Sequence, residues 1–327
     1  MTQFWGRNRL IVLAYVAMVA LLLITALFSP GFLSESNLRS TVVLAAFVGI
    51  VAFGQTFVII GGGIDLSLPW VLNCAAILMT LLANSQDLPL LWVAPVVLAG
   101  GLVIGLINGV GVALFGVPPI IMTLASNVIL QGLILVYTGG SPTPSAPPLI
   151  QFLAVGRLGP IPVIAFIWLA LAAIAWVLLS KAAFGRHLYA LGTSAKVAEF
   201  SGVPTTRTTI STYAISGVTA ATAGMLLTGY SGQAYLGMGD SYLFTSIAAV
   251  AIGGASILGG SGHYLGTIAG ALVLTILSGL LPALNLSSGA LLLVYGAVIL
   301  LTVALGSETF AGLGGVLFNR RRDRGGT

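Results

Sequence analysis

Long apolar runs occupy most of the chain, and this pattern constrains the fold more than any other feature. The runs are roughly 17–25 residues long, the length that an α-helix needs to cross the hydrocarbon core of a bilayer. In hydrocarbon, only helices and closed barrels satisfy their backbone hydrogen bonds, and these runs lack the alternation of barrel strands. The sequence therefore predicts an all-α polytopic integral membrane protein.

The composition excludes two other classes of protein. Of the 327 residues, 58% are hydrophobic and 6% are charged, whereas a soluble domain has about 25% charged residues. The net charge of +5 could indicate a nucleic-acid partner, but the basic residues flank apolar runs and form no surface interleaved with aromatics. We therefore predict neither a soluble domain nor a nucleic-acid partner.

Ten spans are predicted, and the basic residues orient them. Their approximate bounds are 10–28, 41–60, 67–84, 90–114, 118–138, 161–180, 208–230, 242–260, 264–281 and 289–306. Ten of the twelve Lys and Arg residues lie before the first span, in the loop over 181–207 or in the tail over 307–327. Because cytoplasmic segments carry an excess of Lys and Arg, both termini and this loop are expected in the cytoplasm.

Glycine and proline mark the segments between and within these spans. The external loop over 139–160 contains five prolines and is predicted to form an ordered cap or partner surface. Two glycine-rich stretches, 61–67 and 253–260, break their spans after an Ile-Gly-Gly sequence. Such breaks can mark transport sites. They can equally be tight turns at the cytoplasmic surface, which the predicted topology favours.

Glycines inside a span predict close helix packing instead. Gly101, Gly105 and Gly109 recur at every fourth position, and small residues let membrane helices approach closely.

The chain lacks the side chains that catalysis, metal binding or ATP hydrolysis would need. His187 and His263 lie in or near loops, and no metal-ligand spacing or membrane Ser-His-Asp set occurs. Neither Lys181 nor Lys196 follows a glycine, so a nucleotide-binding P-loop is absent. We predict no catalytic residue, no metal and no cofactor bound by this chain.

Uncharged polar residues inside the spans are candidates for a translocation pathway. All seven acidic residues are predicted at span ends or in loops, whereas ion-coupled carriers usually place ionisable groups in mid-membrane. A neutral solute is therefore expected. The residues predicted to line its pathway are the uncharged Gln55, Asn73, Asn127 and Tyr230, together with Asp65 in the first glycine-rich stretch. Hydrogen bonding between helices is the alternative role for each of them.

The loop over 181–207 contains signals for a short helix. Ser194 suits the N-cap, Gly202 suits the left-handed residue after the C-terminus, and Pro204 prevents continuation. Because so short a helix is marginal alone in water, it needs a partner to pack against. Together with the missing energy source, this favours a docking helix for a cytosolic motor over a plain surface turn.

Three motifs in order resemble the permease subunits of bacterial ABC importers for monosaccharides of the ribose, galactose, arabinose and xylose type. They are TFVIIGGGIDLS over 56–67, YALG over 189–192 with SGV over 201–203, and IAAVAIGG over 247–254 with LGG over 258–260. The resemblance extends from about residue 40 to about residue 305.

This resemblance implies a larger machine in the bacterial inner (plasma) membrane. The chain, 1–327, would be a single transmembrane permease domain and not an enzyme. Its partners would be a second permease chain, identical or homologous, and cytosolic P-loop ATPase subunits that hold ATP and Mg. A periplasmic solute-binding protein would face the loop over 139–160. The residues implied to couple to the ATPase are Gly192, Ser194, Ala198, Glu199, Phe200 and Gly202.

The sequence departs from the family pattern at several positions. Leu243 and Thr245 replace two acidic residues, and Glu199 replaces a basic one, which suggests a complementary basic site on the ATPase. Two alternatives stay open: an importer permease for branched-chain amino acids or nucleosides, and a stand-alone secondary carrier or channel.

Overall fold

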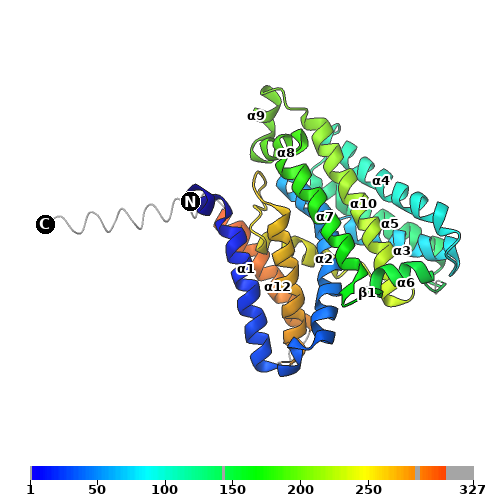
Figure 1. Ribbon diagram of the computed structural model, residues 1–327. Coiled ribbons are helices and arrows are strands. Elements are labelled where there is room, and N and C mark those ends of the chain that lie inside the picture. The colour runs from blue at the N-terminus through cyan, green and yellow to red at the C-terminus, as the bar shows by residue number, and fades with distance from the viewer. Residues whose placement is uncertain (1, 142–143, 284–287, 307–327) are drawn as a thin grey trace.

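The computed structural model describes residues 2–141, 144–283 and 288–306, so the predicted tail over 307–327 lies outside the described residues. Helices account for nearly all of its regular structure (Figure 1). The helices are α1 (Thr2–Phe28), η1 (Pro30–Leu33), α2 (Glu35–Ile60), α3 (Leu68–Ala83), α4 (Leu90–Ala113), α5 (Pro119–Thr138), α6 (Pro148–Val155), α7 (Val163–Ser180), α8 (Ala183–Thr193), α9 (Ala195–Phe200), α10 (Thr205–Ser231), α11 (Tyr242–Ile252), α12 (Tyr264–Ala283) and α13 (Ser288–Gly306). Strands β1 (Arg157–Leu158) and β2 (Ile161–Pro162) pair antiparallel.

Seven helices within the described ranges are long and apolar enough to cross a bilayer. They are α1, α2, α4, α5, α7, α10 and α12. Helices α3 and α11 are also apolar but have only 16 and 11 residues. The predicted all-α membrane class is thus confirmed. The predicted span over 242–260 is wrong in extent, because α11 ends at Ile252 and Gly254 then adopts a φ of +83°.

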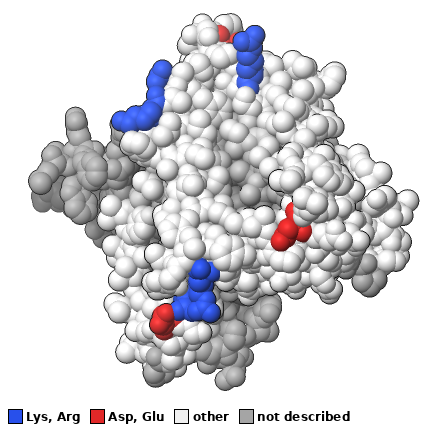
Figure 2. All heavy atoms as spheres, turned by 45° about the vertical axis from the view of Figure 1, so that its right-hand side comes forward, with Lys and Arg blue, Asp and Glu red and all other residues white. Residues whose placement is uncertain are grey.

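Helix α2 forms the centre of the molecule (Figure 1). Of the residues in its most apolar 18-residue stretch, 94% are buried. Helices α7, α10, α11 and α12 pack against it. The peripheral helices α1, α4 and α5 instead expose apolar side chains such as Leu13, Leu91 and Val136. Most of the face shown in Figure 2 carries no charge, as expected for a surface that contacts lipid.

Helices α4 and α10 approach each other through glycine. A Cβ atom added at Gly105 would overlap the backbone carbonyl of Tyr213, and one at Gly101 would lie 2.5 Å from the Gly217 oxygen. At Gly109 the added atom would lie 2.7 Å from the Ile210 Cα. The predicted close packing along this glycine row is therefore confirmed.

The proline-rich loop after α5 is ordered in the residues that the structure describes. It contains α6 and β1, and the Ala146 N–H donates to the Gly232 carbonyl at 2.8 Å. The Leu149 N–H donates to the Asp87 carboxylate at 2.8 Å. The loop thereby closes one end of the bundle against the segments that follow α3 and α10.

Candidate functional site

The break after α2 carries irregular backbone into the helix bundle. Gly62 turns the chain with a φ of +85°, a conformation that glycine adopts without steric cost. The chain then runs inward, and Asp65 is only 2% exposed. Asp65 thus lies between helices and not at the surface. The expectation of a plain surface turn is wrong for Asp65 and Ser67, because the bundle encloses both residues.

Hydrogen bonds from protein groups occupy both oxygens of the Asp65 carboxylate. The Ser67 N–H and Ser67 hydroxyl donate to Oδ1 at 2.9 and 2.6 Å. The Ser216 hydroxyl of α10 donates to Oδ2 at 2.6 Å. A buried charge is tolerated when it is hydrogen-bonded in this way. We infer that Asp65 anchors the break to α10, and its predicted contact with solute stays a prediction.

The same network reaches two more helices. The Asn108 amide of α4 donates to the Ser67 hydroxyl at 2.8 Å, and the Ser126 hydroxyl of α5 donates to the Asn108 carbonyl at 2.5 Å. Thr123 of α5 accepts from the Leu66 N–H at 3.0 Å. The break is therefore fastened to α4, α5 and α10 at once.

We expect Asp65→Asn to destabilise the detergent-purified protein by about 1.5–3 kcal/mol, since a hydrogen bond to a charged group contributes about that much. Asp65→Leu should cost more, because Ser67 and Ser216 would keep buried donors without an acceptor. Thermal unfolding monitored by tryptophan fluorescence checks both changes. Asp240→Asn, an exposed loop substitution, is the control. An Asp65→Asn protein that unfolds at the wild-type temperature would contradict the anchoring role.

The other predicted pathway residues have different surroundings. Gln55 is fully buried in α2, and among the described residues neither polar atom of its amide has a hydrogen-bond partner. Asn73 accepts from the Gly237 N–H at 3.1 Å and thus holds the loop before α11. Asn127 is half-buried in α5. Tyr230 is 45% exposed and packs edge-on against Phe47. Their contact with solute stays a prediction.

The second glycine-rich break meets the first. The Gly260 N–H donates to the Ile60 carbonyl at 2.9 Å. Gly259 and Gly62 are so close that a Cβ at Gly259 would lie 2.8 Å from the Gly62 Cα. The end of α2 and the loop that follows α11 are thus joined by backbone contacts.

Helix α8 packs directly on this junction. A Cβ added at Gly192 would overlap the Ile60 carbonyl oxygen and the Gly260 backbone nitrogen. The Tyr189 hydroxyl also donates to the Gly262 carbonyl at 2.7 Å. Because these neighbours are backbone atoms, only glycine fits at position 192. Helix α8 is therefore in direct contact with both breaks.

Helix α9 continues from α8 and projects from the bundle (Figure 1). The Ser194 hydroxyl accepts from the Val197 N–H at 3.3 Å, and Gly202 has a φ of +78°. These features confirm the predicted helix between the two residues. Ala198 is buried, whereas Phe200 is 82% exposed. Glu199 is exposed and forms no salt bridge within the described part of the chain.

Sequence reasoning missed three parts of these sites. It did not identify α8, although Phe184, Leu188 and Leu191 recur with the spacing of one helix face. It also did not identify Ser126, the partner of Asn108, or the anchoring residue Ser216. No local pattern distinguishes these two serines from others in membrane helices.

Comparison with known proteins gives consistent results. The family described as "Branched-chain amino acid transport system / permease component" matches residues 37–303. A ribose import permease protein of Bacillus subtilis is 37% identical, over 89% of this chain and 91% of its own length. The corresponding Haemophilus influenzae protein is 34% identical with the same coverage. A galactose/methyl galactoside import permease protein of Escherichia coli is 33% identical, over 91% of this chain and 94% of its own length.

No solved structure matched the chain. The family match nevertheless includes the glycine-rich break after α2, the α8–α9 segment and the glycine-rich break after α11. The chain belongs to this family of membrane permease components of transport systems.

Proposed function

We propose that this chain is the permease subunit of an ATP-driven importer and forms the pathway for a neutral monosaccharide or sugar-like solute. The observation that carries the proposal is the α8–α9 segment. It exposes an apolar tip at one end and packs through Gly192 against both helix breaks at the other. This arrangement suits a segment that binds a cytosolic ATPase and passes its movement to the membrane helices.

The proposed assembly contains a second permease chain, cytosolic P-loop ATPase subunits that bind ATP and Mg, and a periplasmic solute-binding protein. It lies in the bacterial inner (plasma) membrane, with about ten spans and with the N-terminus, α8–α9 and the tail in the cytoplasm. Four basic residues in the segment over 181–207 support this orientation. The loop over 139–160 is then periplasmic and available to the binding protein.

The relatives favour sugar over amino acid as the solute. Those compared above are import permeases for ribose and for galactose or methyl galactoside, and another is an autoinducer 2 import permease. Among the residues whose side-chain burial the structure describes, Asp65 is the only buried acidic or basic residue, and its oxygens accept from Ser67 and Ser216. An amphoteric amino acid would need charged partners that this interior lacks.

Reconstitution tests the proposal directly. The chain should be co-expressed with the ATPase and secreted binding protein encoded in neighbouring reading frames and then purified in detergent. We expect the ATPase to co-purify at equal stoichiometry with the permease. Vesicles containing the complex should accumulate radiolabelled D-ribose or D-galactose only when ATP and the binding protein are present.

Two outcomes would contradict the proposal. Uptake by vesicles that contain the permease chain alone would support a stand-alone carrier. ATP-dependent uptake of leucine, with none of either sugar, would support the amino-acid alternative.

A further inference from the structure

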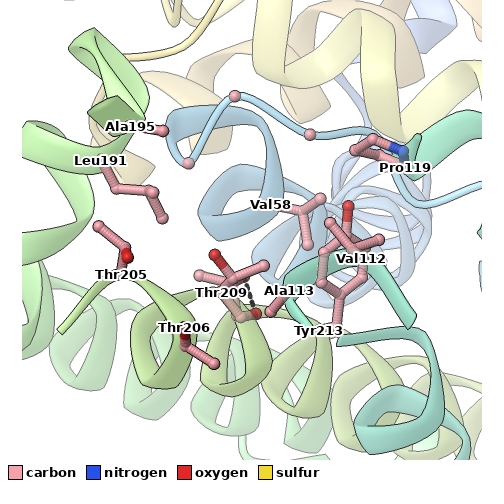
Figure 3. A pocket seen from close by; sticks show the side chains of 14 residues that line it. Val58, Val112, Ala113, Pro119, Leu191, Ala195, Thr205, Thr206, Thr209 and Tyr213 are labelled. Atoms are coloured by element: carbon pink, nitrogen blue, oxygen red, sulfur yellow. Dashed lines mark hydrogen bonds between the residues drawn. The ribbon is translucent and has the colours of Figure 1, made fainter. Parts of the chain in front are cut away.

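A pocket of about 270 Å³ lies beneath the α8–α9 segment (Figure 3). One wall consists of Leu191 of α8 and Ala195 of α9, and another is the Gly61–Gly63 turn. Val58 of α2, Val112 and Ala113 of α4 and Pro119 of α5 also line it, and the first turns of α10 contribute hydroxyl-bearing side chains. These are Thr205, Thr206, Thr209, Thr212 and Tyr213.

Tyr213 shows that the pocket has unused capacity for hydrogen bonding. Its side chain is only 2% exposed, and its hydroxyl has no hydrogen-bond partner among the residues that the structure describes. This hydroxyl lies against Gly63, where an added Cβ would be 2.5 Å from it. Since a buried polar group without a partner costs free energy, a ligand hydroxyl at this position would be stabilising.

The charge of the surroundings selects the ligand class. None of the residues that line the pocket carries a charge. An anion would find no Lys, Arg or His side chain in the lining. A cation would find no carboxylate in the lining. Hydroxyl groups both donate and accept, so a neutral molecule with several hydroxyls matches the threonines, Tyr213 and the glycine backbone.

From these features we propose that the pocket binds a small neutral polyol or monosaccharide and that its occupancy slows the transport cycle. The proposal rests on the proposed function, which makes α8–α9 the moving part. The pocket has walls on α8, α9, α10 and the turn after α2, so a ligand that bridges them stabilises this arrangement over others. The transport cycle requires the complex to pass through several conformations. A ligand that binds only one of these conformations stabilises it and therefore slows the cycle. The transported solute itself, released on this side, has the required chemistry.

Binding to the isolated permease chain tests the site independently of transport. We expect tritiated D-ribose or D-galactose to bind in a scintillation proximity assay. Combining Thr206→Val with Thr209→Val should weaken this binding about fivefold or more, because each lost hydrogen bond reduces affinity by a factor of roughly two to ten. Tyr213→Phe, as a separate variant, should also weaken it. Thr222→Val makes the same change on α10 at a threonine that does not line the pocket, and should bind sugar as wild type does.

ATP hydrolysis by the whole complex tests the regulatory effect. In lipid nanodiscs containing the ATPase and loaded binding protein, millimolar sugar should lower hydrolysis by the wild type and by Thr222→Val. Hydrolysis by Thr206→Val/Thr209→Val should be less sensitive to added sugar. If this variant binds sugar as well as wild type does, the proposal that sugar binds in this pocket is contradicted, whatever the uptake measurements show. Absence of any sugar binding by the wild type would also overturn it, even if ATP-dependent uptake proceeds and the proposed function stands.

Discussion

Gly192→Ala should abolish most transport while leaving the protein folded and the ATPase bound. The added methyl group would overlap the Ile60 carbonyl and the Gly260 nitrogen, and neither backbone atom can move away cheaply. Overpacking of this kind costs about 1–3 kcal/mol, and 1.4 kcal/mol is a factor of ten in an equilibrium constant. We therefore expect ATP-dependent uptake to fall about tenfold or more, because α8 can no longer seat on the junction of the two breaks.

Gly132→Ala is the matched control for this change. Gly132 lies within α5 and has open space where its Cβ would be, so uptake should stay at the wild-type level. Uptake, ATPase co-purification and size-exclusion profile should be measured for both variants. Normal uptake by Gly192→Ala would show that the contact between α8 and the breaks does not carry the coupling.

Replacing Val197 and Phe200 together with Asp should eliminate co-purification of the ATPase. Their side chains are 63% and 82% exposed on the projecting helix α9. Fully burying a Val or Phe side chain contributes about 1.5–3 kcal/mol. The double substitution removes two such contacts and adds two charges that the partner would have to desolvate. We therefore expect the affinity for the ATPase to fall roughly a hundredfold or more.

Phe115→Asp provides the comparison for the docking prediction. Phe115 is 78% exposed in the connection between α4 and α5, which is separate from α9 in sequence. We expect this variant to retain the ATPase in a pull-down with the tagged permease. If Phe115→Asp releases the ATPase and the Val197/Phe200 variant does not, α9 is not the docking element. A normal melting temperature for each variant excludes misfolding as the cause.

The features that sequence analysis predicted correctly have local causes. Ser194 and Gly202 frame α9 because capping involves groups within a few residues of each other. The row from Gly101 to Gly109 indicated close packing because its spacing places three small residues on one helix face. Apolar run length likewise identified the long membrane helices.

The features that it missed depend on contacts between distant parts of the chain. Asp65 looked like a residue at the surface because no nearby residue indicates that Ser216 of α10 will bind it. The predicted span over 242–260 was too long because the run remains apolar after Ile252, although the glycines allow the backbone to turn. The meeting of Gly260 with Ile60 is determined by tertiary packing, which neither glycine-rich stretch reveals alone.

The bond between Gly260 and Ile60 has a mechanical consequence. It links the end of α2 to the loop that follows α11, so under the proposed function a movement of α8 would displace both segments. A helix as short as α9 would then need to act on only one contact region to affect both glycine-rich breaks.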